Sequence, residues 1–187
     1  SPIAGTWYPG DPVILRSEIE GFLHAARPFK TTGSIVGLIV PHAGYRYSGI
    51  TAGQGYACLE GLDFDLVVVV SPLHQAHPAR LLTSAHKVYE TPLGQIKLDL
   101  HSLHTFQRLL FEDSGLTLTE IANDEEHSLE IQLPFLQVVL AKPFQLLPIM
   151  VRSESEELTR VVGETLARVV GGLKVLLVAS TDLSHFY

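Results

Sequence analysis

The stretch Ile35-Val36-Gly37-Leu38-Ile39-Val40-Pro41-His42 decides the fold of this chain. A short, β-branched apolar run closed by a proline is typical of a strand that is buried on both faces. Other runs have the same continuous apolar character, and they lie at Leu66 to Val70, Gln145 to Val151 and Lys174 to Ser180. Continuous rather than alternating apolarity indicates parallel strands that are covered on both sides.

The residues between these strands carry helical patterns. Asp11-Pro12 is typical of an N-cap followed by the first residue of a helix, and the apolar spacing continues to about residue 26. Ser153, with Glu156 three residues later, predicts a capping box for a helix to about Val170. Further helices are expected at 48–59, 101–111 and 127–140, with Pro134 either kinking the last one or shifting its start.

One region departs from this alternation of strands and helices. Leu81 to Tyr89 and Gln95 to Leu98 are expected to form a hairpin around Thr91-Pro92-Leu93-Gly94 that extends or flanks the main sheet. Elsewhere each strand is followed by a helix, which is the crossover that parallel strands require. The sequence therefore predicts a single α/β domain over residues 1–187, with a largely parallel or mixed sheet flanked by helices.

Composition excludes several classes of function. The formal net charge of −7 over 187 residues argues against a surface that neutralises phosphate groups, so no nucleic-acid partner is expected. The longest apolar runs are far shorter than the roughly 20 residues that cross a bilayer, so no membrane span is expected. Cys58 is the only cysteine, which rules out an intrachain disulfide and favours a cytoplasmic setting.

Metal-binding or proton-transferring side chains follow three of the four core strands. His42 comes after the first strand, His74 after the second, and Asp182 and His185 after the last. In an open parallel sheet, ligands bind beyond the carboxyl ends of the strands, so we expect these residues to converge. Two imidazoles and one carboxylate suit iron or zinc and leave coordination positions open. Each residue taken alone has the ordinary alternative of a capping or hydrogen-bonding group.

The acidic segment Asp124-Glu125-Glu126 precedes the helix that is expected to begin at His127. Its carboxylates are expected to stabilise the helix N-terminus. His127 has two interpretations, a structural group and a proton shuttle with a tuned pKa. Trp7 either lines a pocket or packs against the core. The remaining histidines are expected not to bind metal: His24, His77, His86, His101 and His104.

Five motifs resemble those of the Memo family and occur in the family's order. They are Ala4-Gly5-Thr6-Trp7-Tyr8, Pro41-His42-Ala43-Gly44-Tyr45, Ser71-Pro72-Leu73-His74, Asp124-Glu125-Glu126-His127-Ser128-Leu129-Glu130 and Ser180-Thr181-Asp182-Leu183-Ser184-His185. The resemblance runs over essentially the whole chain and about the first two-thirds of a typical member, such as the B-type protein of the AmmeMemoRadiSam system. It implies a fold like that of class III extradiol, protocatechuate-type dioxygenases, incomplete at the C-terminus.

The resemblance also implies a metal site. His42 and His74 match metal ligands of the family, while Asp182 and His185 match further pocket residues. The family takes a cysteine ligand from a later segment, which Cys58 does not match. The implied metal is iron or copper, with zinc as an alternative, and no nucleotide cofactor is expected. The implied pathway partners are a radical-SAM protein and an AMMECR-type protein.

These observations leave three functions open. The first is iron- or copper-dependent redox or oxygenase-type chemistry, in which Asp182 completes or orients the site and His185 or His127 transfers protons. The second is a non-catalytic module that holds a peptide, a small molecule or an anion in the same pocket. The third is zinc-dependent hydrolysis. An exposed sheet edge would favour a homo-oligomer.

Overall fold

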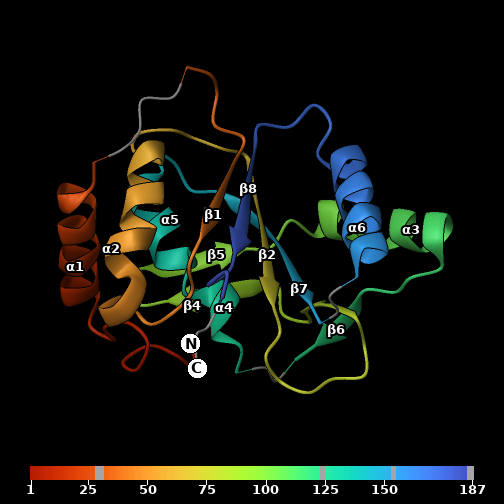
Figure 1. Cartoon of the computed structure of the whole chain (residues 1–187), viewed down its shortest axis with the longest axis horizontal. Coiled ribbons are helices and arrows are strands. Elements are labelled where there is room, and N and C mark those ends of the chain that lie inside the picture. The colour runs from red at the N-terminus through yellow and green to blue at the C-terminus, as the bar shows by residue number, and fades with distance from the viewer. Residues whose placement is uncertain (28–31, 123–124, 153–154, 185–187) are drawn as a thin grey trace.

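A six-stranded sheet in the order β1-β8-β2-β7-β3-β6 forms the centre of the molecule (Figure 1). The computed structural model describes the chain apart from residues 28–31, 123–124, 153–154 and 185–187. Neighbouring strands are parallel except for β3, which runs antiparallel to β7. The predicted α/β class with a largely parallel, mixed sheet is therefore confirmed. The strands are β1 (Gly37–Val40), β2 (Leu66–Pro72), β3 (Leu81–Ser84), β6 (Thr119–Ile121), β7 (Gln145–Val151) and β8 (Val175–Ser180).

Helices cover both faces of the sheet. On one face lie α1 (Pro12–Ala25), α2 (Tyr45–Tyr56) and α5 (Leu133–Val139), and on the other lie α3 (Leu100–Ser114) and α6 (Glu156–Val169). A short 3-10 helix, Ala57–Leu59, continues α2. Most of strand β2 is buried between these layers, including Leu66 to Val69. None of the helices in the described part of the chain combines the length and apolarity needed to cross a membrane.

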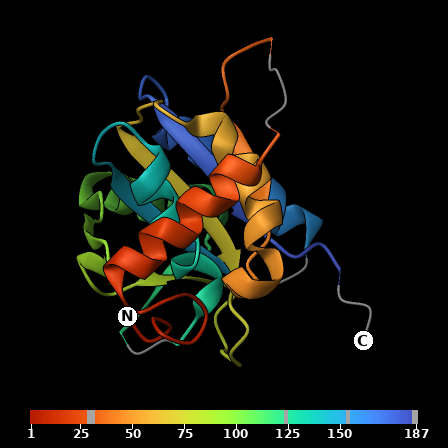
Figure 2. The same ribbon diagram turned by 90° about the vertical axis from the view of Figure 1, so that its left-hand side faces the viewer.

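Helices α1 and α2 lie side by side (Figure 2) because glycines remove the side chains between them. A Cβ atom at Gly53 would lie 3.0 Å from the backbone oxygen of Phe22 in α1. One at Gly49 would lie 2.4 Å from the ring of the same phenylalanine. The start of α1 follows the sequence prediction, since the Asp11 side chain accepts hydrogen bonds from the backbone N–H groups of Val13 and Ile14.

The first strand lies at the edge of the sheet, where β1 is paired with β8. Ile39 in β1 is 71% exposed. The expectation that this strand is buried on both faces was therefore wrong. Apolar composition identifies a strand, but the order of strands in a sheet depends on pairings between distant segments.

Two predicted elements are each divided in the structure. Within the expected hairpin, β3 joins the main sheet, whereas β4 (Val88–Thr91) and β5 (Gly94–Lys97) form a separate two-stranded ribbon. The helix expected at 127–140 is split into α4 (His127–Glu130) and α5. Pro134 lies in the first turn of α5, where its missing N–H group has no intrahelical partner to lose. The proline therefore marks a new helix start rather than a kink.

The cap of α6 differs from the predicted one. The Ser155 side chain accepts a hydrogen bond from the backbone N–H of Leu158 and forms the N-cap. Ser153, the cap that the capping-box pattern predicts, lies outside the described residues. The helix itself, ending at Val169, agrees with the prediction.

Candidate metal site

Strand order brings three of the predicted strand-end residues together. Because β8 lies between β1 and β2, the segments that carry His42, Asp182 and His74 leave the same end of the sheet as neighbours (Figure 1). Helix α4 contacts β2 and begins with His127. Residues that are far apart in the sequence thus meet at the carboxyl ends of parallel strands.

Three histidines form a cluster with the spacing of a metal site. One ring nitrogen each from His42, His74 and His127 lies within 4.8 Å of the other two. The rings of His74 and His127 stack with centroids 4.8 Å apart, and His42 meets both edge-on at 5.3 and 5.6 Å. The sequence allowed two interpretations of His127, a structural group and a proton shuttle. In the structure His127 lies where it can act as a third ligand.

A buried hydrogen-bond network determines which nitrogen of His42 is available. The Ser180 hydroxyl donates its proton to the backbone oxygen of Ser128 at 2.5 Å. It accepts a hydrogen bond from the side-chain amide of Gln132 at 2.7 Å and lies 3.2 Å from Nδ1 of His42. Since the hydroxyl has one proton, it can only accept from His42, so Nδ1 carries the hydrogen. The lone pair of the neutral ring is then on Nε2.

Glu126 likewise determines which ring nitrogen of His74 carries the hydrogen. Its Oε1 lies 2.9 Å from Nδ1 of His74, and its Oε2 accepts a hydrogen bond from the backbone N–H of His74 at 2.6 Å. An ionised carboxylate only accepts hydrogen bonds, so Nδ1 of His74 is the donor, and in the neutral ring Nε2 keeps the lone pair. Sequence reasoning gave Glu126 only a role at the helix N-terminus, because contact with a loop 52 positions away leaves no local signal.

Burial shapes the charge states of the cluster. It lowers the pKa of the His42 ring below its ordinary value, although nearby Asp182 acts in the opposite direction. Burial also lowers the pKa of His127, against the attraction of Glu126. For Glu126, burial alone would raise the pKa, but hydrogen bonds from His74 and Ser128 outweigh it and lower the pKa. These shifts favour the neutral form of His42 and His127 and the ionised form of Glu126.

Asp182 orients the His42 segment. Its Oδ1 accepts hydrogen bonds from the backbone N–H groups of His42 at 2.7 Å and Ala43 at 3.2 Å. Its Oδ2 lies 3.7 Å from Nε2 of His42, at the border of the cluster. His185, the other strand-end residue singled out in the sequence, lies outside the described residues.

Trp7 covers one side of the cluster. Its ring stacks on that of His127 at a centroid distance of 3.7 Å and an interplanar angle of 15°, and its side chain is 36% exposed. The N-terminal segment is held on both sides of this contact. The Trp7 backbone oxygen accepts a hydrogen bond from Tyr45, and the hydroxyl of the next residue, Tyr8, donates to Glu130 at 2.6 Å.

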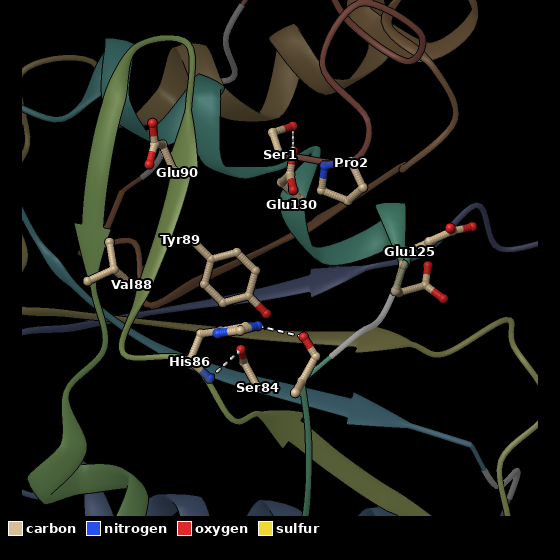
Figure 3. A pocket seen from close by; sticks show the side chains of 11 residues that line it. Ser1, Pro2, Ser84, His86, Val88, Tyr89, Glu90, Glu125 and Glu130 are labelled. Atoms are coloured by element: carbon tan, nitrogen blue, oxygen red, sulfur yellow. Dashed lines mark hydrogen bonds between the residues drawn. The ribbon is translucent and has the colours of Figure 1, made fainter.

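A cavity of about 430 Å³ adjoins this site (Figure 3). It is lined by Glu125, Glu126 and Glu130, with Tyr89 and His86 at another wall, and its lining includes none of the cluster histidines. The Nε2 atom of His86 lies 2.5 Å from the backbone oxygen of residue 122. None of the five histidines expected not to bind metal belongs to the three-histidine cluster in the described part of the chain.

Comparison with known proteins identifies the family. The sequence model of the Memo-like protein family matches residues 1–187. The chain belongs to the Memo-like family. Two relatives of this Memo-like chain are described as MEMO1 family proteins. A MEMO1 family protein of Nitrosopumilus maritimus is 31% identical over 188 residues, and one of Methanococcoides burtonii is 34% identical over 186 residues.

The matches extend over nearly all of this Memo-like chain. Each of these two alignments covers 98% of the chain and 67% of the relative. The chain therefore spans about two thirds of the length of these relatives. The resemblance inferred from the five sequence motifs is confirmed, and those motifs include His42, His74 and His127 of the cluster.

Proposed function

We propose that this Memo-like chain binds one first-row transition metal ion, iron or copper, through His42, His74 and His127. The observation that supports this most directly is the convergence of one nitrogen from each ring within 4.8 Å. Neutral imidazole is a preferred ligand of iron, copper and zinc. A bound iron or copper ion would supply redox or dioxygen chemistry, and three ligands would leave positions open for a substrate.

The hydrogen bonds around the cluster support a metal site over an ordinary polar cluster. In His42 and His74 the Nδ1 atoms face Ser180 and Glu126, so each ring keeps its Nε2 lone pair. Metal-bound histidines commonly make such a hydrogen bond through the second ring nitrogen. Burial lowers the pKa of His42 and His127, which favours the neutral form that binds metal.

Asp182 can contribute to this site without binding the metal itself. Its Oδ1 fixes the backbone of His42, which leaves Oδ2 beside Nε2 of the same ring. A carboxylate in that position can accept a proton from a group bound next to the metal. We propose that Asp182 orients His42 and takes part in proton transfer, with His185 as a second group for that step.

Zinc-dependent hydrolysis is the second candidate function. Three histidine ligands and an open position are also the donor set of catalytic zinc, which activates a bound water molecule. The three-histidine cluster therefore suits both redox and hydrolytic chemistry, and the preferred metal distinguishes them. We propose iron or copper first because of the family resemblance.

Anaerobic calorimetric titration of the demetallated protein with Fe(II), Cu(I) and Zn(II) tests the proposal. We expect saturable binding of one ion that is abolished in the His42→Ala/His74→Ala double variant. The matched control is His101→Ala/His104→Ala, which removes two exposed histidines of α3 outside the cluster. Circular dichroism checks that each variant remains folded.

The outcomes of this titration separate the candidate functions. Tight binding of iron or copper supports redox chemistry, and binding restricted to zinc supports hydrolysis. Equal metal affinity in the wild type and the His42→Ala/His74→Ala variant would contradict the proposal that these histidines bind the metal. A protein that binds no metal but still binds a peptide or an anion would be a non-catalytic module instead.

A further inference from the structure

Glu126 caps a helix and also makes contacts that a helix cap does not require. It is the N-cap residue of α4, and its Oε1 accepts a hydrogen bond from the backbone N–H of Ser128 at 2.9 Å. A serine or an aspartate caps a helix equally well, and with a shorter side chain. The longer glutamate is almost fully buried, at 4% exposure, and reaches across to the loop after β2.

Both oxygens of Glu126 contact this loop. Oε2 accepts from the backbone N–H of His74, while Oε1 lies 2.9 Å from Nδ1 of the same residue. Oε1 also lies 3.4 Å from Nδ1 of His127. One carboxylate therefore contacts the Nδ1 atoms of two of the three clustered rings.

The surroundings of His74 make this contact important for its orientation. Its side chain is 45% exposed. The ring stacks on His127 and meets His42 edge-on, but these ring contacts do not decide which ring nitrogen carries the hydrogen. Arg152 holds the loop backbone, donating to the oxygens of Leu73 and Gln75, but the ring itself is oriented by Glu126. Without that carboxylate, the ring would lose the acceptor that keeps the hydrogen on Nδ1 and could exchange it between its nitrogens.

We propose that Glu126 is a positioning residue of the proposed metal site, which keeps His74 and His127 turned toward His42 with the Nδ1 hydrogens fixed. The inference rests on the proposed function. A carboxylate that accepts from a ligating histidine keeps Nε2 free of hydrogen and raises the basicity of the ring. Loss of such a partner typically weakens metal binding by about 10–100-fold.

The substitution Glu126→Ser separates this role from helix capping. Serine is a favourable N-cap residue, so the cap of α4 is retained, but its side chain is too short to reach His74. We expect Fe(II), Cu(I) or Zn(II), whichever the wild type binds, to bind the variant about 10–100-fold more weakly. The matched control is Glu125→Ser, which removes the same charge from the exposed neighbouring residue and should leave the affinity unchanged.

Nitrogen-15 NMR of the histidine rings provides a readout without metal. At about pH 8, where an ordinary imidazole is neutral, we expect the Nδ1–H tautomer at His74 in the wild type. In the Glu126→Ser variant the ring should shift toward the Nε2–H tautomer, which free histidine favours. A merely structural cap would not change the tautomer of a ring on another segment.

Failure of this inference is distinguishable from failure of the proposed function. Wild-type metal affinity in the Glu126→Ser variant, or an Nε2–H tautomer of His74 in the wild type, would overturn the positioning role while leaving the metal site intact. A wild type that binds no metal would overturn the proposed function. The tautomer of His74 would then still decide whether Glu126 orients the ring.

Discussion

Ser180 and Ser71 are buried serines near the ends of adjacent strands, but their hydroxyls have opposite surroundings. Ser180 Oγ joins Ser128, Gln132 and His42 in one network. Ser71 Oγ, at the end of β2, has no hydrogen-bond partner among the described residues. A buried polar group stabilises a protein only when it is hydrogen-bonded. Two buried serines therefore contribute differently to stability, and residue type and burial alone do not show which of the two hydroxyls is hydrogen-bonded.

Replacement of each serine by alanine should have different results. Ser180→Ala leaves the backbone oxygen of Ser128 and Nδ1 of His42 without this partner, so we expect a loss of about 1–3 kcal/mol in the free energy of unfolding. Metal affinity should fall as well, by about tenfold or more, because His42 loses its orienting partner. Ser71→Ala should leave both quantities unchanged or raise stability slightly. Urea denaturation and calorimetric titration measure both, and equal effects of the two substitutions would contradict the network.

At the scale of elements, the contact between α1 and α2 depends on small residues. The space around Gly53 is closed by backbone atoms of Phe22, which cannot move without shifting α1. Gly163 in the middle of α6 differs, because no other residue comes within 4 Å of a Cβ atom built there. The same residue type is thus required in one helix and dispensable in the other.

The substitution of these glycines by alanine should change stability in opposite directions. In α2, overpacking by Gly53→Ala should cost about 1–3 kcal/mol, which exceeds the gain in helix propensity. In α6, Gly163→Ala should stabilise the protein by about 0.5–1 kcal/mol, since alanine favours the helix and meets no neighbour. Thermal unfolding monitored by circular dichroism measures both, and a stabilising Gly53→Ala would show that the two helices can separate at little cost.

At the scale of the whole molecule, the proposed ligands join three distant segments. His42 follows β1, His74 follows β2 and His127 begins α4, and the order of strands brings them together only in the folded chain. A metal that binds the native state and not the unfolded chain shifts the folding equilibrium toward the native state. The cluster should therefore couple metal binding to global stability.

Metal addition should raise the melting temperature of the demetallated protein. With free metal at about 100 times its dissociation constant, the added stability is about 2.7 kcal/mol. For a chain of this length that corresponds to an increase of about 5–10 °C. Differential scanning fluorimetry with and without metal measures the shift, and the His42→Ala/His74→Ala variant provides the control. A similar shift in that variant would place the metal elsewhere in the protein.

The sequence by itself determined the α/β class, the core strands after residue 65 and the start of α1. These follow from local signals, namely continuous apolar runs and the Asp11-Pro12 cap. It also predicted that His42 and His74 lie close together, because residues that follow parallel strands meet at one end of the sheet. Only the tertiary structure decided that β1 is an edge strand and that His127 joins the cluster. The hydrogen bonds of Glu126 and Ser180 likewise depend on contacts between segments far apart in the chain, for which no local pattern exists.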